Sequence, residues 1–445
     1  MKIYYSLYDR LLNYEALSDA FNKVYSANGS AGLDGIGVKE FENDQRIHLN
    51  QLLYELKDKT YRPSPVLRVE IPKDGGAVRK LGIPTVRDRI VQQAVTTILS
   101  PIFEEDFHVS SFGYRPKHSC HQAIAKSMMY IRKYHLDHVV DMDLSKCFDT
   151  LDHGFLMKCL RKRVVDGSLL NLIKLFLESG IMDNGNFEES VVGSPQGGVI
   201  SPLLSNIYLN EFDQEMKRRN HRIIRYADDI LIFKRTKKGA EKALKSATEI
   251  LEKQLKLTVN LEKTHIAHSS KGIKYLGIVI YKTVTSIQDK KLKAMKSKLK
   301  KMTARNSPVN LAKLVSELNP VLRGYANYFR IANCKGNFEA VMAWLRRRLR
   351  SKQLKLWKKP RRLHRELRKQ GYSTEGLALI KMSTWRNSCS PQVHRAIGND
   401  FFDKIGLYNL QKVEVAIPVQ FPVEIKGGAV YEIRTYGSVR GMDYG

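Results

Sequence analysis

The sequence predicts an α+β protein, with strands and helices mixed up to about residue 290 and helices dominating after it. Two observations in the first part support this. Short apolar runs typical of buried strands recur there, and segments with helical apolar spacing lie between them. Beyond about 290, the strand signals give way to helical segments dense in Lys and Arg, so we expect a domain boundary at 285–295.

The first elements are short helices followed by a hairpin. Residues 6–62 show helical patterns interrupted by a glycine-containing loop at 28–32. Residues 69–73 and 80–84 then flank a turn at 74–76, which predicts a β-hairpin.

The centre of the chain combines buried strands with helices. Pro202 favours a helix start there, because proline is tolerated in the first helical turn. The last fifty residues mix strand-like and glycine-containing segments and receive no assignment. Strands are expected at 138–144, at 223–233 as strand–turn–strand and at 275–280, and helices at 87–104, 153–180 (two helices), 202–219 and 238–256.

The charge balance points to nucleic acid as a partner. The chain has 445 residues, enough for two to four domains, and its 75 Lys and Arg against 45 acids leave a net charge of +30. A hydrophobic fraction of 43% argues against general disorder. No apolar run approaches the roughly 20 residues of a spanning helix, so we expect no membrane partner.

Cysteine usage indicates a reducing compartment. The five cysteines are odd in number and widely spaced, and no CxxC pair suggests a zinc module. The N-terminus lacks the apolar core of a signal peptide. We therefore expect a cytoplasmic protein.

Three aspartates form the candidate catalytic site. Asp228 and Asp229 lie at the tip of a predicted hairpin with apolar arms, and Asp143 follows another predicted buried strand. Carboxylates at neighbouring strand ends can hold two Mg²⁺ ions, with Mn²⁺ as a substitute and the carbonyl of Leu144 as a further ligand. Asp-Asp is also ordinary turn chemistry, but two buried flanks make that reading the weaker one. Asp141, on the same face as Asp143, is interpreted as a supporting residue.

Motifs in a fixed order carry a family resemblance. They are Asp143-Leu144-Ser145-Lys146-Cys147-Phe148-Asp149, Ser194-Pro195-Gln196-Gly197-Gly198 and Tyr226-Ala227-Asp228-Asp229. The chain resembles the reverse transcriptase/maturase proteins encoded by bacterial group II introns, over residues 28 to about 410. Cys147 departs from the family pattern, which commonly has an aromatic residue there, and Ser194 stands where Thr is usual.

The resemblance implies a right-hand polymerase fold with four regions. These are an N-terminal extension with an RNA-binding loop (1–62), fingers and an antiparallel palm (63–290), a helical thumb (291–360) and a maturase/DNA-binding region (361–445). The sequence shows neither paired cysteines nor a His-Asn-His arrangement, so it resembles the lineage without an endonuclease domain.

The resemblance also implies roles for single residues. Asp143, Asp228 and Asp229 match the metal ligands. Residues near the incoming nucleotide are Lys73, Arg79, Leu144, Phe148, Gln196 and Lys263. The Lys and Arg of the hairpin suit a triphosphate, and Phe148 would exclude a 2′-hydroxyl.

Nucleic-acid contacts are expected in the fingers, the palm and the basic helical part. Between residues 340 and 371 there are 13 Lys or Arg and one acid, a ratio that favours binding to a phosphate backbone. Arg115 either contacts template or braces the fold. The candidate contacts are Asn28, Gly29, Arg115, Gly277, Arg346, Arg347, Arg350, Lys358, Lys359, Arg361 and Arg362.

The leading hypothesis is a Mg²⁺-dependent RNA-directed DNA polymerase that also binds group II intron RNA for splicing and retrohoming. Its partners would be intron RNA, an RNA template with a DNA primer, dNTPs, target DNA and, without RNA, a second copy of the chain. The alternatives are a domesticated relative serving defence or repair, and an RNA-binding splicing cofactor with an idle polymerase site. RNA-directed RNA synthesis is disfavoured by Phe148.

Overall fold

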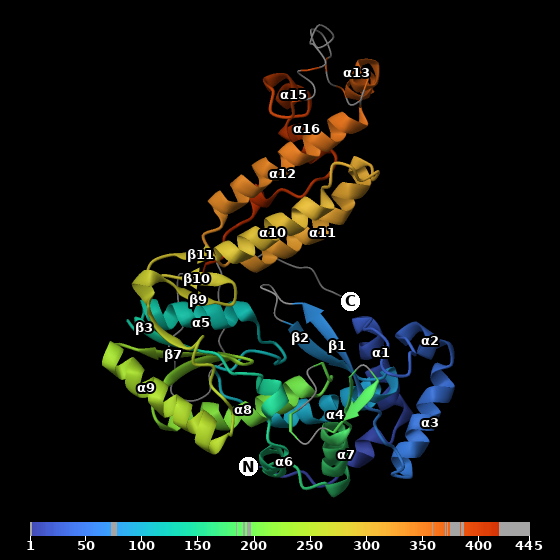
Figure 1. Ribbon diagram of the computed structural model, residues 1–445, viewed down its shortest axis with the longest axis vertical. Coiled ribbons are helices and arrows are strands. Elements are labelled where there is room, and N and C mark those ends of the chain that lie inside the picture. The colour runs from blue at the N-terminus through green and yellow to red at the C-terminus, as the bar shows by residue number, and fades with distance from the viewer. Residues whose placement is uncertain are drawn as a thin grey trace. The chain divides into compact units, whose positions relative to one another are not determined.

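The computed structural model describes residues 2–72, 78–183, 185–189, 192–193, 197–357, 359–369, 371, 373, 383 and 387–417. The chain forms two compact units, Met1–His268 and Ser269–Gly445. The first combines helices with antiparallel sheets and the second is mainly helical (Figure 1), so the predicted α+β class is confirmed.

The first unit begins with helices that pack on a long buried helix. A 3₁₀ turn (Tyr8–Leu11), α1 (Tyr14–Ala27), α2 (Val38–Asn43) and α3 (Gln45–Lys57) precede α4 (Val86–Glu104). The hydroxyl of Thr85 caps α4 by accepting from the Asp88 N–H. Apolar residues at helical spacing on α4 are buried against α1 and complete this part of the core.

The predicted hairpin is present, and it joins a second pair of strands. β1 (Val66–Pro72) pairs antiparallel with β2 (Val78–Ile83), with Ile71 opposite Arg79. β4 (Ile181–Asp183) runs parallel to β1, and β5 (Asn186–Glu188) completes the sheet order β2-β1-β4-β5.

The central sheet is antiparallel, and three of its four strands are buried on both faces in their middle residues. Its order is β6-β7-β3-β8. Ile230 and Ile232 face one side and belong to the main core with α8, whereas Phe233 faces the other side and contacts Tyr130 of α5 at 5.1 Å between ring centroids. Burial on both faces explains the continuous apolar runs of these strands. The bounds are β3 (His138–Met142), β6 (Arg222–Tyr226), β7 (Asp229–Lys234) and β8 (His265–His268).

Further helices complete the first unit, and all were expected from the sequence except α5. They are α5 (Cys120–Arg132), α6 (His153–Arg161), α7 (Gly167–Glu178), α8 (Ser201–Arg218) and α9 (Lys237–Glu249), with a 3₁₀ turn at Cys147–Thr150 and a π-turn at Ile250–Gln254. Among them, α5, α8 and α9 pack on the central sheet.

The second unit opens with a small sheet that corrects one prediction. The expected single strand at 275–280 is wrong, because Leu276 and Gly277 both have positive φ (45° and 79°) and form a two-residue turn. Tyr275 therefore pairs with Ile278. In the sequence, two short apolar strands joined by a two-residue turn with one apolar residue look like a single longer apolar strand. The strands are β9 (Ile273–Tyr275), β10 (Ile278–Ile280) and β11 (Thr285–Ile287).

In the residues that the structure describes, the rest of the second unit is mainly helical, and helices were predicted there up to the last fifty residues. It contains α10 (Asp289–Met302), α11 (Leu311–Phe329), α12 (Lys335–Leu356), α13 (Pro360–Lys369), α15 (Pro391–Ala396) and α16 (Asn399–Lys404), with 3₁₀ turns at Ser269–Lys271 and Leu410–Lys412. Within the described part of the chain, no helix combines the length and apolar character that crossing a membrane requires.

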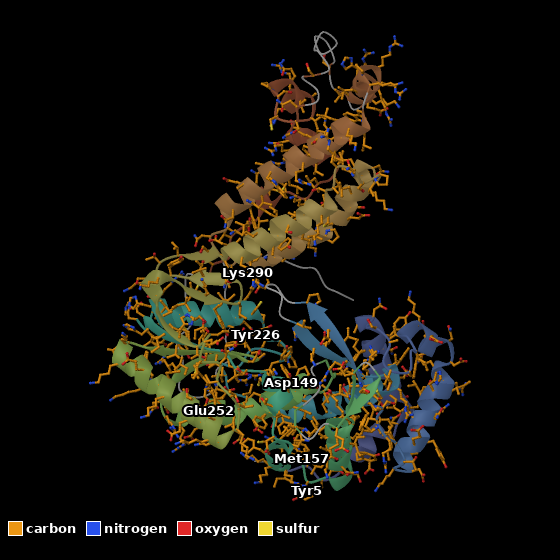
Figure 2. All side chains as sticks on the ribbon, viewed as in Figure 1. Tyr5, Asp149, Met157, Tyr226, Glu252 and Lys290 are labelled. Atoms are coloured by element: carbon orange, nitrogen blue, oxygen red, sulfur yellow. The ribbon has the colours of Figure 1, made fainter. Side chains whose placement is uncertain are left out.

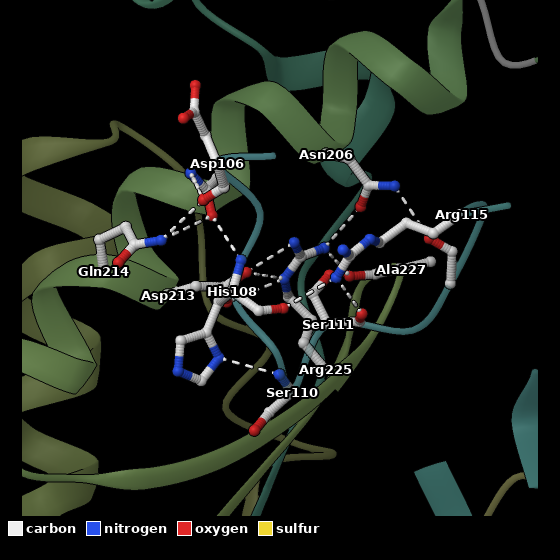
Figure 3. Close-up of polar contacts among 12 residues, drawn as sticks. Asp106, His108, Ser110, Ser111, Arg115, Asn206, Asp213, Gln214, Arg225 and Ala227 are labelled. Atoms are coloured by element: carbon white, nitrogen blue, oxygen red, sulfur yellow. Dashed lines mark hydrogen bonds and ion pairs between the residues drawn. The ribbon is translucent and has the colours of Figure 1, made fainter. Parts of the chain in front are cut away.

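The segment between α4 and α5 runs beside the end of β6 (Figure 3). Ser111 forms an isolated parallel bridge with Arg225. His108 lies buried at the start of this segment, and its Nδ1 accepts from the Ser110 N–H at 3.2 Å, which fixes an uncharged imidazole. Burial lowers the pKa of His108 to about 4, although the nearby Asp213 carboxylate acts in the opposite direction.

The depressed pKa of His108 predicts acid sensitivity of the fold. The unfolded chain takes up a proton at this histidine near pH 6.5, but the folded chain does so only near pH 4, so stability is lost as pH falls between these values. Between pH 7 and pH 5.5, the free energy of unfolding should fall by about 1 kcal/mol more in the wild type than in His108→Asn. Denaturant titrations at both pH values measure this difference, and equal losses would contradict it.

Candidate active site

The strand pairing brings the three predicted aspartates to one edge of the central sheet. β3 pairs with β7 so that Met142 is opposite Ile230, and continuing this register places Asp143 opposite Asp229. β6 and β7 are joined by a two-residue turn, since Tyr226 pairs with Asp229, and Asp228 lies in that turn. The structure therefore places Asp143, Asp228 and Asp229 together.

The electrostatics of this edge reflect crowding of like charges. The pKa of Asp228 is raised, first by burial and then by Asp143. The pKa of Asp229 is raised to about 7 by burial and by the carboxylates of Asp228, Asp141 and Asp143. Burial raises the pKa of Asp141 to about 6, and Asp143 adds to the shift. Neighbouring carboxylates thus oppose the ionisation of Asp141, Asp228 and Asp229.

Asp143 has the most complete set of partners in the cluster. Its Oδ2 accepts from Lys263 Nζ at 2.9 Å and from Asn260 Nδ2 at 3.1 Å. Its carbonyl accepts from the Asn260 N–H, and the next residue, Leu144, bridges Val259. The hydrogen bond and charge of Asp143 raise the pKa of Lys263. Lys263 therefore acts as a protein-borne counter-ion for the cluster.

The donor set fits Mg²⁺ by its chemistry. Burial first and neighbouring carboxylates second raise the pKa values of Asp228 and Asp229. Carboxylate oxygens are the ligands that Mg²⁺ prefers, and a divalent cation would relieve the repulsion between them. Among the residues that the structure describes, no three His, Cys, Asp or Glu side chains are already close enough to hold an ion. Binding would thus need the carboxylates to rearrange, with Lys263 competing for Asp143.

Residues around the cluster offer a cation and an aromatic wall. Arg79 on β2 opposes the raised pKa of Asp228 by its positive charge. Phe148 is buried in the 3₁₀ turn after Asp143, and its ring meets that of Tyr114 edge-on at 6.4 Å. The charges of Asp228 and Asp229 contribute to a raised pKa of Tyr114. Figure 2 marks Tyr226 at the start of the turn.

Tyr114 is the neighbour that the sequence did not single out. The sequence contains one signal, the glycine at position 113 directly before Tyr114. In the structure, a Cβ at Gly113 would lie 2.4 Å from the backbone N of Ala227. This close approach explains the glycine and places the next residue beside the catalytic turn. Three predicted contacts, Lys73, Gln196 and Lys358, lie outside the described residues.

Arg115 has the contacts of a bracing residue. Its side chain is 5% exposed and binds Glu104 through Nε and Nη2, with Nη1 donating to the carbonyls of His108 and Ser111. All three nitrogens have protein acceptors, which favours bracing among the two roles expected for Arg115, and contact with template stays a prediction.

Three other candidate contacts lie where the backbone conformation or close packing restricts the residue type. Asn28 is exposed at the C-terminus of α1 with φ 45°. Gly29 packs so close to Arg89 that a Cβ would lie 2.6 Å from its Nη1. Gly277 occupies the β9–β10 turn at φ 79°.

The basic helices divide their cations between the interior and the surface. Arg346 is buried and donates to Gln411 Oε1 at 2.8 Å. Arg350 is buried too, and its Nε donates to the Ile397 carbonyl at 2.7 Å. Both guanidinium groups thus have structural partners, and the expected phosphate contacts of these two arginines stay predictions. Four other predicted contacts are exposed: Arg347, Lys359, Arg361 and Arg362.

Comparison with protein families defines the class. Residues 71–280 match the family "Reverse transcriptase (RNA-dependent DNA polymerase)", and residues 292–371 match "Group II intron, maturase-specific domain". With the aspartate cluster inside the first match, the protein is an RNA-directed DNA polymerase joined to a maturase-specific domain. The chain belongs to the family of group II intron-encoded reverse transcriptase/maturases.

Individual relatives agree with this assignment. Protein YkfC of Escherichia coli is 37% identical over 302 residues, 59% of this chain and 79% of that protein. Group II intron-encoded protein LtrA of Lactococcus lactis is 29% identical over 344 residues, and the chain spans 56% of its length. Among solved structures, telomerase from Candida albicans aligns at 12% identity over 85% of this chain and 69% of that one, with a TM-score of 0.43, too low to show a shared fold.

The Lys263–Asp143 pair predicts an effect on metal affinity. In Lys263→Met the cluster loses its counter-ion and the competitor for Asp143, so Mg²⁺ should bind several-fold more tightly. Thermal unfolding over a Mg²⁺ titration measures this affinity. Lys253→Met, which removes the surface pair with Glu249, is the matched control and should leave it unchanged. Unchanged or weaker Mg²⁺ binding in Lys263→Met would count against the competition.

Proposed function

We propose that the protein copies RNA into DNA by two-metal nucleotidyl transfer at Asp143, Asp228 and Asp229, and that it binds group II intron RNA for splicing and retrohoming. The observation that carries the proposal is the register that puts Asp143 opposite Asp229 and Asp228 in the adjoining turn. Like charges facing each other across strands are unfavourable, and their retention is typical of a cation site.

The side chains of this unit supply positioning and charge. Asp143, Asp228 and Asp229 would hold Mg²⁺, with the Leu144 carbonyl as a further ligand. When bound, the ions would activate a primer 3′-hydroxyl and neutralise the leaving pyrophosphate. Arg79 would bind the incoming triphosphate, since it already acts on Asp228 by its charge. Phe148 would lie beneath the sugar and disfavour a 2′-hydroxyl.

The exposed cations of the second unit support RNA binding. Arg347 on α12 and Arg361 and Arg362 on α13 have exposed side chains, and the match to a maturase-specific domain covers all three. Intron RNA is the partner that this domain implies. An RNA template with a DNA primer, dNTPs and target DNA are the further partners of the proposed activity.

Substitution of the turn aspartate tests the polymerase site. Asp228→Asn should reduce Mg²⁺-dependent primer extension on an RNA template by about 1,000-fold or more, because a metal ligand is lost. Intron RNA binding should persist. Asp137→Asn, just before the other end of β3, is the control and should retain activity. Undiminished cDNA synthesis in Asp228→Asn would refute the site, whereas an inactive wild type that still promotes splicing would support an idle polymerase.

Substitutions of two arginines on α12 distinguish an effect on stability from an effect on RNA binding. Arg350→Met leaves the Ile397 carbonyl buried without its donor and should cost about 1–3 kcal/mol, seen as a lower melting temperature. Arg347→Met should not change the melting temperature but should lower the slope of log K against log salt for RNA binding by about one. If Arg347→Met binds RNA with an unchanged salt slope, α12 does not contact phosphate there.

A further inference from the structure

The catalytic turn has a backbone conformation that its sequence does not favour. Ala227, the first residue of the two-residue turn, has φ 57°. Left-handed backbone costs an L-residue other than Gly, Asn or Asp roughly 1 kcal/mol or more, and turns of this kind usually carry Gly or Asn there. An alanine in this conformation needs contacts elsewhere to hold it.

Arg225 supplies such a contact from inside the protein. Its side chain is fully buried, with 0% exposure, and lies against Asp213 of α8, which is also 0% exposed (Figure 3). Nε donates to both carboxylate oxygens of Asp213 at 2.9 Å, and Nη2 donates to Oδ2 at 2.7 Å. This pairing fixes the guanidinium plane and leaves Nη1 pointing toward the turn.

Nη1 is the atom that reaches the catalytic turn. It donates to the Ala227 carbonyl at 3.0 Å and to Asn206 Oδ1 at 2.9 Å. Asn206 Nδ2 in turn donates to the Gly113 carbonyl at 2.8 Å. Gly113 presses on the other side of the turn, where a Cβ would lie 2.4 Å from the Ala227 N. The strained residue is thus held between Gly113 and Arg225.

The backbone of Arg225 is fixed by the same segment. Its N–H donates to the Ser110 carbonyl and its carbonyl accepts from the Phe112 N–H, each at 2.9 Å. Arg115 holds the Ser111 carbonyl at 2.6 Å. The residue before the turn can therefore move little, and a change at its guanidinium acts on Ala227.

We propose that Arg225 is a positioning residue for nucleotidyl transfer, which holds the Ala227 carbonyl so that Asp228 keeps its place in the turn beside Asp143 and Asp229. The inference rests on the proposed polymerase function. A lysine could neutralise Asp213 with its single ammonium, but it cannot present the planar fork that binds Asp213, Asn206 and Ala227 together. Arg225→Lys therefore keeps the buried charge and removes the grip on the turn.

The first experiment separates rate from binding. In Arg225→Lys, the rate constant of primer extension at saturating dNTP should fall about 10- to 100-fold, because a small displacement of Asp228 suffices. The KM for dNTP and the affinity for intron RNA should change less than about threefold, because the residues that bind them are untouched. A wild-type rate in Arg225→Lys would overturn the proposal.

A matched buried arginine controls for general destabilisation. Arg163 is 3% exposed and forms ion pairs with Asp106 and Glu105. Neither of these ion pairs involves a residue of the catalytic turn. Arg163→Lys should lower the melting temperature and leave the extension rate within about twofold of the wild type. An equal loss of rate in both lysine variants would reduce Arg225 to a stabilising residue and overturn the proposal.

Coupling to Ala227 provides a readout that a purely structural role would not move. Glycine adopts positive φ without cost, so in an Ala227→Gly background the Arg225→Lys substitution should reduce the rate severalfold less than in the wild type. The same fractional loss in both backgrounds would overturn the mechanism. If Arg225→Lys does not fold, Asn206→Ala tests the same grip with the Asp213 pair intact, and it should show the same coupling.

The two proposals fail in different ways. If the wild type makes no cDNA and Asp228→Asn is no different, the polymerase function fails. If the wild type is active and Asp228→Asn is not, but Arg225→Lys extends primers like the wild type, only the role of Arg225 fails.

Discussion

The candidate active site depends on a sheet register that places like-charged carboxylates together at one edge of the central sheet. Antiparallel pairing puts Asp143 opposite Asp229, and burial together with the neighbouring carboxylates raises the pKa of Asp229 to about 7. The register cannot slip to relieve this repulsion. A shift of one residue would exchange the two buried faces of β7 and turn Ile230 and Ile232 away from the main core. Hydrophobic burial thus holds an electrostatically unfavourable site in place.

Sequence patterns predicted the β1–β2 hairpin and the strands β3, β6 and β7 that lead to the aspartates, because these depend on local regularities. Buried strands give continuous apolar runs, and a two-residue turn between them gives Asp228 its place. The partners of cations were not predictable in this way. Arg115, Arg346 and Arg350 looked like phosphate contacts, yet each is buried against protein acceptors. A sequence shows where a charge is but not what the fold puts opposite it. Only a long-range contact distinguishes Arg350 from the exposed Arg347.

The excess of positive charge in the second unit therefore serves two purposes. Lys352 is buried and donates to the Ser307 carbonyl at 2.8 Å, in the loop after α10. Arg348 donates to the Thr303 hydroxyl at 2.7 Å and so holds α12 to the end of α10. Only the remaining exposed cations present charge to a polyanion. Net charge alone overstates the RNA-binding surface, because buried cations satisfy backbone carbonyls that would otherwise lack donors.

The buried Arg225–Asp213 pair follows the same logic at the catalytic edge. Ion pairs removed from water contribute little net stability, because desolvation offsets their attraction. What the pair provides is a fixed orientation of the guanidinium. With Nε and Nη2 bound to Asp213, Nη1 donates to the Ala227 carbonyl. A hydrophobic replacement could fill the volume but could not hold an alanine at φ 57°. The fold thus uses a costly interior charge to fix the conformation of the turn that carries Asp228.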